Sequence, residues 1–207
     1  MSAPFRVVVL ISGAGTNLQA LLDQVHSPGG PIEIVGVAAS RPDAAGLDRA
    51  RQAGVETAVF EIDGERAERD RALGDWLESQ EVDLVVLAGF MELLGAELIG
   101  RFAGRMINVH PSLLPAFPGL RAIEQAVEYG VKTTGVTVHF VDEGVDSGAI
   151  VLQEPLELSY PARIAEIEQQ VHGVEHRLLP RAVRLIAAGG IRTDPANPRA
   201  VLIDDVD

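Results

Sequence analysis

The chain has 207 residues, of which 47% are hydrophobic and 23% charged, a composition typical of a globular protein that buries a substantial core. Its formal net charge of −13 argues against nonspecific nucleic-acid binding, which needs a basic surface, although a locally positive cleft could still bind a small anion. The absence of cysteine excludes disulfides, thiolate nucleophiles and cysteine-based metal sites, and no apolar run is long enough to cross a membrane. The N-terminus lacks the apolar region and cleavage site of a signal peptide, so we expect a cytoplasmic protein.

The predicted elements begin with a strand over residues 5–11, which is mostly apolar and β-branched and is therefore expected to be buried on both faces. The segment that we call the glycine loop follows at once and consists of Gly13, Ala14, Gly15, Thr16 and Asn17. Apolar residues then recur at helical spacing, and backbone N–H groups at a helix N-terminus favour a bound phosphate. Thr16 or Asn17 could cap this helix, and the alternative is a tight turn whose glycines serve packing alone.

The glycine loop favours a phosphate over a whole dinucleotide. The dinucleotide fingerprint needs a third glycine where this chain has Leu18. The next strand, predicted over residues 32–39, ends in Ser40 and Arg41 and not in an acidic residue, although Arg41 could accept the 2′-phosphate of NADP. We therefore expect phosphate binding without a dinucleotide.

The following segments alternate between helix and strand. We predict helices over residues 43–53 and 65–80, and strands over residues 55–60, 82–88 and 106–109. Repeated alternation of this kind indicates an α/β fold, with a doubly wound, mostly parallel, Rossmann-like sheet and helices on both of its faces.

Two groups of side chains in this part of the chain have two interpretations each. The 65–80 helix carries Arg66, Arg69 and Arg71. We expect these arginines to form a solvated face, although any of them could point into a cleft. The loop after the 82–88 strand, where open α/β sheets place ligands, carries Met91, Leu93 and Leu94. We expect these apolar residues in the core, and the alternative is that they line an apolar pocket.

Asn108 and His110 lie two residues apart at the end of the 106–109 strand, so their side chains point in the same direction. An asparagine amide can donate to a developing oxyanion, and a histidine can move a proton near neutral pH or, when charged, polarise a carbonyl. Pro111 and Pro115 restrict the loop that follows. Such a pair could hold an acyl group and manage its protons, but alone it also fits a strand-end cap with a surface histidine.

Residues 135–141 and 149–153 predict a hairpin around an acidic loop. The carboxylates of this loop are those of Asp142, Glu143 and Asp146. They lack the ligand spacing of an EF-hand, so we expect no metal site. An ordinary acidic turn is one interpretation, and the functional one places Asp146 near His110, where it would orient the imidazole and favour its charged form.

Apolar residues at helical spacing predict a long helix over residues 161–188, which Pro180 is expected to kink or break. Three polar residues lie off its apolar stripe, namely His172, Glu175 and His176. We expect them to be exposed, although Glu175 could bind an amine. The tail over residues 191–207 is expected to form a short edge element or to be loose.

Four parts of the chain carry a family resemblance. They are Ile11 to Ala20 (ISGAGTNLQA), Leu87 to Met91 (LAGFM), Ile107 to Pro115 (INVHPSLLP) with Phe117 to Gly119 (FPG), and Gly135 to Val141 (GVTVHFV) with Asp146 to Gly148 (DSG). In these residues and in their order the chain resembles the folate-dependent phosphoribosylglycinamide formyltransferase family. The resemblance implies one formyltransferase domain over residues 1–190, with a phosphate-binding half up to about residue 100, a folate and catalytic half after it, and a C-terminal tail over residues 191–207.

The resemblance also implies an activity and a set of binding residues. The enzyme would transfer the formyl group of its co-substrate, 10-formyltetrahydrofolate, to the amine of glycinamide ribonucleotide in purine biosynthesis. The catalytic residues would be Asn108, His110 and Asp146. The ribonucleotide would contact Gly13, Ala14, Gly15, Thr16 and Asn17 through its phosphate, and His172, Gly173, Val174 and Glu175 near its glycinamide. The folate would contact Arg66, Met91, Glu92, Leu93, Leu94, Asn108, Asp142, Glu143, Gly144, Val145 and Asp146.

The implied chemistry agrees with the residue types. When the amine attacks the formyl carbon, Asn108 and a protonated His110 could stabilise the oxyanion, and His110 with Asp146 could carry the proton. The reaction requires neither a metal nor a covalent enzyme intermediate. We expect no nucleic-acid or membrane partner, and a monomer or a homodimer.

Three positions depart from the family pattern. Glu92 stands where many relatives carry arginine, which reverses a charge in the expected folate loop. Arg121 stands where the family often has histidine, and arginine cannot titrate, so any proton role there is lost. Thr16 replaces the usual serine and keeps the hydroxyl.

Several rival functions share part of this pattern. A formyltetrahydrofolate deformylase shares the fold and the three polar residues but uses water as acceptor, and it usually carries an N-terminal regulatory domain and replaces Pro111. A methionyl-tRNA formyltransferase adds a C-terminal RNA-binding domain, which neither the length nor the acidic tail of this chain suggests. The missing third glycine weighs against an NADP-dependent oxidoreductase. A non-catalytic nucleotide-binding protein could retain the polar residues without needing them.

Overall fold

The structure is a computed structural model that describes residues 3–204 of the chain. These residues belong to two compact units, which divide between Ile107 and Asn108. The division falls within one strand, β5 (Met106–His110), which carries the chain from the first unit into the second.

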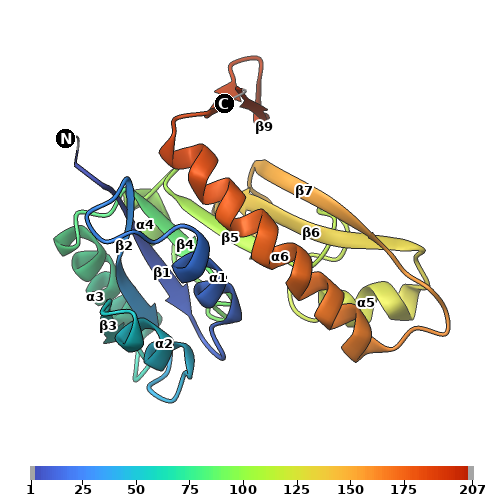
Figure 1. The fold of residues 1–207 in the computed structure, drawn as a ribbon, viewed down its shortest axis with the longest axis horizontal. Coiled ribbons are helices and arrows are strands. Elements are labelled where there is room, and N and C mark those ends of the chain that lie inside the picture. The colour runs from blue at the N-terminus through green and yellow to red at the C-terminus, as the bar shows by residue number, and fades with distance from the viewer. Residues whose placement is uncertain (1–2, 205–207) are drawn as a thin grey trace. The chain divides into compact units, whose positions relative to one another are not determined.

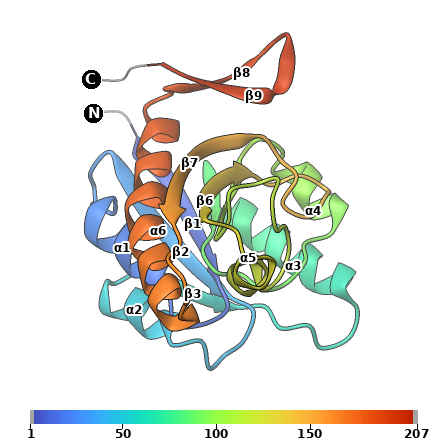
Figure 2. The same cartoon turned by 90° about the vertical axis from the view of Figure 1, so that its right-hand side faces the viewer.

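The first unit is an α/β arrangement of parallel strands. Its strands lie in the order β3 (Glu56–Val59), β2 (Ile32–Ala39), β1 (Phe5–Ile11) and β4 (Leu84–Leu87), and every neighbouring pair is parallel. The connecting helices are α1 (Thr16–Gln24), α2 (Gly46–Gln52), α3 (Arg66–Ser79) and α4 (Ala96–Arg101). Helices α1 and α2 pack together on one face of the strands, and α3 and α4 pack together on the other (Figure 2). The predicted α/β fold with a doubly wound, mostly parallel sheet is confirmed, and α4 is a helix that the sequence did not predict.

The core of the first unit surrounds β1 and β4. The side chains from Val8 to Ile11 are completely buried, and all of β4 is buried. Parallel strands place their carboxyl ends at the same edge, and here the loops at that edge bond to one another. Ser12 N donates to Gly89 O at 3.1 Å, and Ser40 N donates to Ile11 O at 3.1 Å. The glycine loop therefore starts from a rigid edge.

The second unit contains two hairpins and two helices. Strands β6 (Thr133–Phe140) and β7 (Ile150–Glu157) form the predicted antiparallel hairpin. The tail forms a second hairpin, β8 (Ile191–Asp194) and β9 (Asn197–Ile203), whose residue Ala200 pairs with Ile150 of β7. Helix α5 (Ala122–Tyr129) contacts α6 (Ile164–Ala187), which runs along β6 and β7 (Figure 1). The last residues of the predicted tail, 205–207, lie outside the described part of the chain.

Helix α6 continues through Pro180, so of the kink or break expected at this residue the break is wrong. A proline in a helix interior costs about 3 kcal/mol through the lost hydrogen bond and the clash of its ring. Pro180 and its neighbours Leu178, Leu179, Ala182 and Val183 are all buried, and each fully buried large apolar side chain stabilises the fold by about 1.5–3 kcal/mol. Burial of this face outweighs the cost of the proline. None of the helices among residues 3–204 is both long and apolar enough to cross a membrane.

Candidate active site

The second unit brings Asn108, His110 and Asp146 together, and we call these three residues the polar cluster. Asn108 and His110 project from the same side of β5, and Asp146 comes from the loop between β6 and β7. The carboxylate oxygen Oδ2 of Asp146 lies 3.2 Å from His110 Nδ1. The Nδ2 amide group of Asn108 donates to the other oxygen, Oδ1, at 3.3 Å. The side chains of His110 and Asp146 are only 5% and 12% exposed, so these contacts are shielded from water.

His110 faces acceptors on both of its ring nitrogens. Its Nε2 lies 2.8 Å from the carbonyl oxygen of Phe117, and its Nδ1 faces Asp146. A carbonyl and a carboxylate only accept hydrogen bonds, so a neutral imidazole can donate to one of them and an imidazolium to both. The surroundings of His110 are therefore suited to a ring that carries two protons. The carbonyl of Phe117 was not predicted, because a backbone acceptor in a loop leaves no signal in the residue types.

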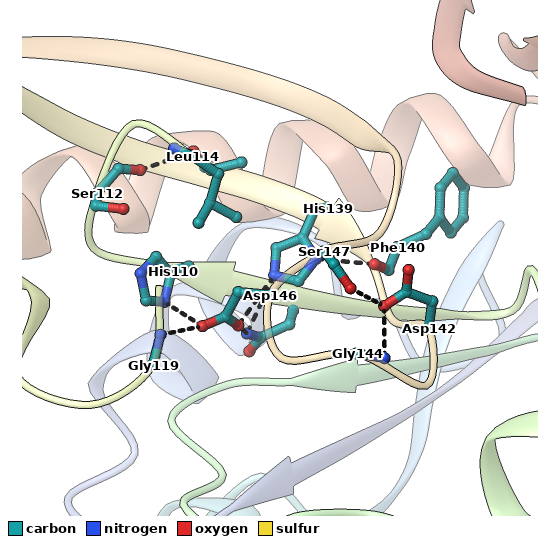
Figure 3. Close-up of polar contacts among 12 residues, drawn as sticks. His110, Ser112, Leu114, Gly119, His139, Phe140, Asp142, Gly144, Asp146 and Ser147 are labelled. Carbon is teal, nitrogen blue, oxygen red and sulfur yellow. Dashed lines mark hydrogen bonds and ion pairs between the residues drawn. The ribbon is translucent and has the colours of Figure 1, made fainter. Parts of the chain in front are cut away.

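Asp146 lies between two histidines and a backbone amide (Figure 3). Gly119 N donates to its Oδ2 at 2.7 Å, and His139 Nε2 lies 3.5 Å from its Oδ1. Burial raises the pKa of the Asp146 carboxyl, but the hydrogen bonds from His139 and Gly119 and the charges of both histidines together hold this pKa below its ordinary value. Asp146 is therefore a carboxylate at neutral pH.

His139 is a residue of the site that the sequence reasoning missed. It is buried on β6, its Nδ1 lies 2.8 Å from the carbonyl oxygen of Phe140, and its Nε2 lies 3.3 Å from Asn108 Nδ2. Since Nδ1 must carry a proton to donate to this carbonyl, Nε2 is free to accept from Asn108 when the ring is neutral. When the ring is charged, Nε2 instead donates to Asp146, so His139 holds Asn108 or Asp146 according to its protonation state. Its only signal was its place in the quoted Gly135 to Val141 stretch, where it appears as one more strand residue.

The loop that delivers Asp146 is closed by a local turn. Asp142 Oδ1 accepts from Gly144 N at 3.1 Å and from Ser147 Oγ at 2.7 Å (Figure 3). The side chains of Glu143 and Val145 are exposed on this turn. Among residues 3–204 there is no group of three or more histidine and acidic side chains arranged to hold a metal ion.

A second pair of interest lies on α6. His172 Nδ1 lies 3.0 Å from Glu175 Oε2, and this hydrogen bond raises the pKa of the half-exposed His172. Glu175 is buried, so the expectation that it is exposed is wrong. A buried carboxylate is tolerated here because it has a partner one turn away. Of the other two residues predicted here, Gly173 is partly exposed, whereas the Val174 side chain is in the core.

The glycine loop belongs to the first unit and is built from main-chain contacts. Gly15 begins α1 in the left-handed conformation (φ 69°), and the helix has no side-chain cap, so Thr16 and Asn17 do not cap it. A β-carbon on Gly15 would lie 2.6 Å from Gly46 Cα, and Gly46 N donates to Gly13 O at 3.0 Å. Since no acidic residue lies in the first turn of α1, the positive end of its dipole is available to an anion.

The loop over residues 90–95, which we call the 90–95 loop, also belongs to the first unit. Met91 and Leu93 have exposed side chains, so the expectation that they are core residues is wrong, while Glu92 and Leu94 are partly buried. Glu92 makes no hydrogen bond or ion pair with any residue that the structure describes.

The three arginines of α3 do not share one environment. Arg66 and Arg71 are exposed, as predicted. Arg69 is buried, so the expectation that it belongs to a solvated face is wrong. The physical reason is an ion pair with its neighbour Asp70, which compensates the charge of Arg69 inside the protein.

Three comparisons place the chain among known proteins. A family model described as formyl transferase matches residues 5–183. The phosphoribosylglycinamide formyltransferase of Haemophilus influenzae is 43% identical over 189 residues, which cover 90% of this chain and 89% of that relative. The crystal structure of glycinamide ribonucleotide transformylase 1 from Symbiobacterium toebii has a TM-score of 0.92 and 43% identity, with 98% of this chain and 95% of that one covered.

The trifunctional purine biosynthetic protein adenosine-3 of Homo sapiens is also 43% identical over 189 residues, or 90% of this chain, but the chain spans only 19% of the length of that relative. The matched region and the fold define a formyl transferase. Within that class the extent of identity is decisive, and the chain belongs to the phosphoribosylglycinamide formyltransferase family of enzymes.

Proposed function

We propose that this chain transfers the formyl group of 10-formyltetrahydrofolate to the amine of glycinamide ribonucleotide, as a step of purine biosynthesis. The observation that carries the proposal is the position of Asp146, which contacts His110 Nδ1 at 3.2 Å and Asn108 Nδ2 at 3.3 Å. The polar cluster thereby combines a donor amide, a proton carrier and a fixed negative charge, which are the groups that acyl transfer to an amine uses. Relatives named for this activity support the choice of substrates.

Asn108 and His110 are the donors that we assign to the formyl oxygen. Negative charge develops on this oxygen when the amine attacks the formyl carbon, and hydrogen-bond donors fixed beforehand stabilise that charge. In the structure these donors face protein acceptors, since Asn108 Nδ2 faces Asp146 and His139, and His110 Nε2 faces the carbonyl of Phe117. The proposal therefore includes an exchange, in which the formyl oxygen replaces at least one of these protein acceptors.

His110 also carries the proton in this proposal. The folate nitrogen must gain a proton and the attacking amine must lose one, so an imidazolium that first donates and then accepts serves both needs and ends the cycle protonated as it began. Asp146 is ionised at neutral pH, and its carboxylate, 3.2 Å from Nδ1, holds the imidazole ring in place for these transfers.

The substrates are assigned to the segments that offer matching chemistry. The backbone N–H groups of the glycine loop would bind the phosphate, with the dipole of α1 behind them. Glu175 would bind the glycinamide amine, with His172 beside it. The folate would contact the exposed Arg66, the 90–95 loop and the turn from Asp142 to Val145.

The test is an assay of formyl transfer from 10-formyltetrahydrofolate, run with and without glycinamide ribonucleotide. We expect the folate to be consumed only when the ribonucleotide is present, and we expect His110→Ala to lose most of this rate. Equal consumption without the ribonucleotide would make water the acceptor and the chain a deformylase. No consumption under either condition, by a wild-type protein that binds the ribonucleotide, would favour a nucleotide-binding role without catalysis.

A further inference from the structure

A buried ion pair joins α3 to the 90–95 loop within the first unit. Arg69 Nε lies 2.7 Å from Asp70 Oδ1, and the two side chains are 1% and 7% exposed. Removing two charges from water is costly unless further hydrogen bonds satisfy the rest of each group. Each of these two side chains makes one further hydrogen bond beyond the pair itself.

The further partners of both side chains are main-chain atoms of the loop. Arg69 Nη2 donates to the carbonyl oxygen of Leu93 at 3.0 Å, and Asp70 Oδ2 accepts from Gly95 N at 2.7 Å. The guanidinium carbon of Arg69 lies 5.8 Å from the centroid of the Phe90 ring. The ion pair thus fixes the loop at two backbone positions, two residues apart.

The start of the loop is fixed in the same manner, because Met91 N donates to Ser12 Oγ at 2.8 Å. All three of these bonds use backbone atoms of the loop, so its side chains remain available. Those of Met91 and Leu93 are 64% and 57% exposed. Large apolar side chains held outward on a fixed loop are typical of a surface that a ligand covers.

We propose that Arg69 is a positioning residue for folate binding, which acts with Asp70 by holding the backbone of the 90–95 loop so that Met91 and Leu93 present a preformed apolar surface. Arg69 has no direct contact with the folate in this proposal. A preformed surface lowers the entropy lost on binding, so its effect appears in affinity for the folate. The inference rests on the proposed function, because that function places the folate at this loop.

The experiment compares Arg69→Met, which keeps the length of the side chain without its charge, with Arg71→Met, a matched control at an exposed arginine of the same helix. We expect Arg69→Met to raise the KM for the folate about tenfold while the KM for the ribonucleotide stays within about twofold. Arg69→Lys should fall between wild type and Arg69→Met, because an ammonium group can pair with Asp70 but lacks the fork that also reaches Leu93 O. A purely structural role would affect both substrates alike.

Hydrogen exchange at the amide of Gly95 provides a readout that does not depend on catalysis. Loss of the ion pair should accelerate exchange at Gly95 in Arg69→Met and leave it unchanged in Arg71→Met. A folate KM equal to that of Arg71→Met, or unchanged exchange at Gly95, would overturn the positioning role. If the wild type shows no transfer at all, the proposed function fails and the exchange comparison still decides the role of Arg69. Should Arg69→Met not fold, Arg69→Lys and Asp70→Asn carry the same comparison.

Discussion

The glycine loop presents main-chain groups, whereas the polar cluster consists of side chains. The glycine loop depends on the absence of a side chain. Gly15 has no β-carbon, so it leaves room for Gly46 and can adopt a left-handed φ of 69°. The polar cluster depends on side-chain atoms. The carboxylate of Asp146, for example, contacts His110, Asn108 and a backbone amide. The first site should therefore be sensitive to added atoms, and the second to removed or altered ones.

The largest effect is expected from Asp146→Asn, which alters one atom of the polar cluster. The amide can still accept from Gly119 N, so the fold should be retained, but the carboxylate charge that lies 3.2 Å from His110 Nδ1 is lost. We expect kcat to fall by about 10²- to 10⁴-fold, the range for losing a general acid–base function. Steady-state kinetics provide the measurement. Asp48→Asn, at an exposed carboxylate that pairs with Arg51, is the control, and a loss of less than tenfold in Asp146→Asn would contradict the proposed role.

Gly15→Ala tests the glycine loop by adding one carbon atom. The new β-carbon would lie 2.6 Å from Gly46 Cα, and a left-handed conformation costs a non-glycine residue about 1–2 kcal/mol. We expect the free energy of unfolding in urea to fall by about 2–4 kcal/mol and the KM for the ribonucleotide to rise. Gly54→Ala is the matched control, since Gly54 has a φ of 73° with nothing within 4 Å. Equal losses of stability in the two variants would show that the close contact with Gly46 is unimportant.

The pH dependence of stability tests the lowered pKa of Asp146 in the polar cluster. The pKa of Asp146 is lowered in the folded protein, so its carboxylate contributes stability above the unfolded pKa near 3.9, and this contribution is lost as the pH falls through the folded value. Wild type and Asp146→Asn should therefore differ most in free energy of unfolding near neutral pH and converge as the pH falls from the unfolded pKa of this carboxyl through its lower folded pKa. A difference that is constant from about pH 7 to pH 3 would contradict the lowered pKa.

The smallest effect is expected at His172, where stability depends on pH in the opposite direction to that at Asp146. Its hydrogen bond to Glu175 raises the pKa of His172, so the stabilisation is fully present below the unfolded pKa near 6.5 and is lost as the pH rises through the folded value. Because His172 is half exposed, we expect His172→Gln to cost less than about 1 kcal/mol at pH 5.5 and nothing at pH 9. NMR titration of the imidazole checks the direction directly, and a pKa at or below about 6.5 would contradict it.

The elements that could be predicted from the sequence are those whose burial is continuous. The strands over residues 5–11 and 32–39 have the predicted bounds, because a strand buried on both faces is apolar along its length. Helix α4 has six residues, which is too short for a periodic pattern to emerge. For the tail, the sequence left open a short edge element or a loose segment, and the structure has the β8–β9 hairpin there; its strands carry polar and charged residues and pair largely with each other, so no apolar pattern decided between the two.

The side chains that could not be predicted are those whose environment comes from another element. Asn108 and His110 share a strand, so their common direction follows from their spacing. Arg69 has the sequence context of a solvated helix face, and besides its neighbour Asp70 its buried guanidinium needs Leu93 O, which comes from a loop 24 residues away. His139 is similar, because its neighbour Asn108 lies 31 residues earlier in the chain. Residue types alone do not reveal such pairings, which only the folded chain creates.

The hydroxyl of Ser12 has a consequence for any redesign of the first unit. Its oxygen receives hydrogen bonds from Ser40 Oγ at 2.7 Å and from Met91 N at 2.8 Å, while the backbone of Ser12 donates to Gly89 O. The loops that follow β1, β2 and β4 thus share a single atom, and both acceptor positions of that atom are in use. The three loops therefore move together. A new loop sequence grafted after any one of these strands must keep its hydrogen bond to the other loops, or all three loops will shift.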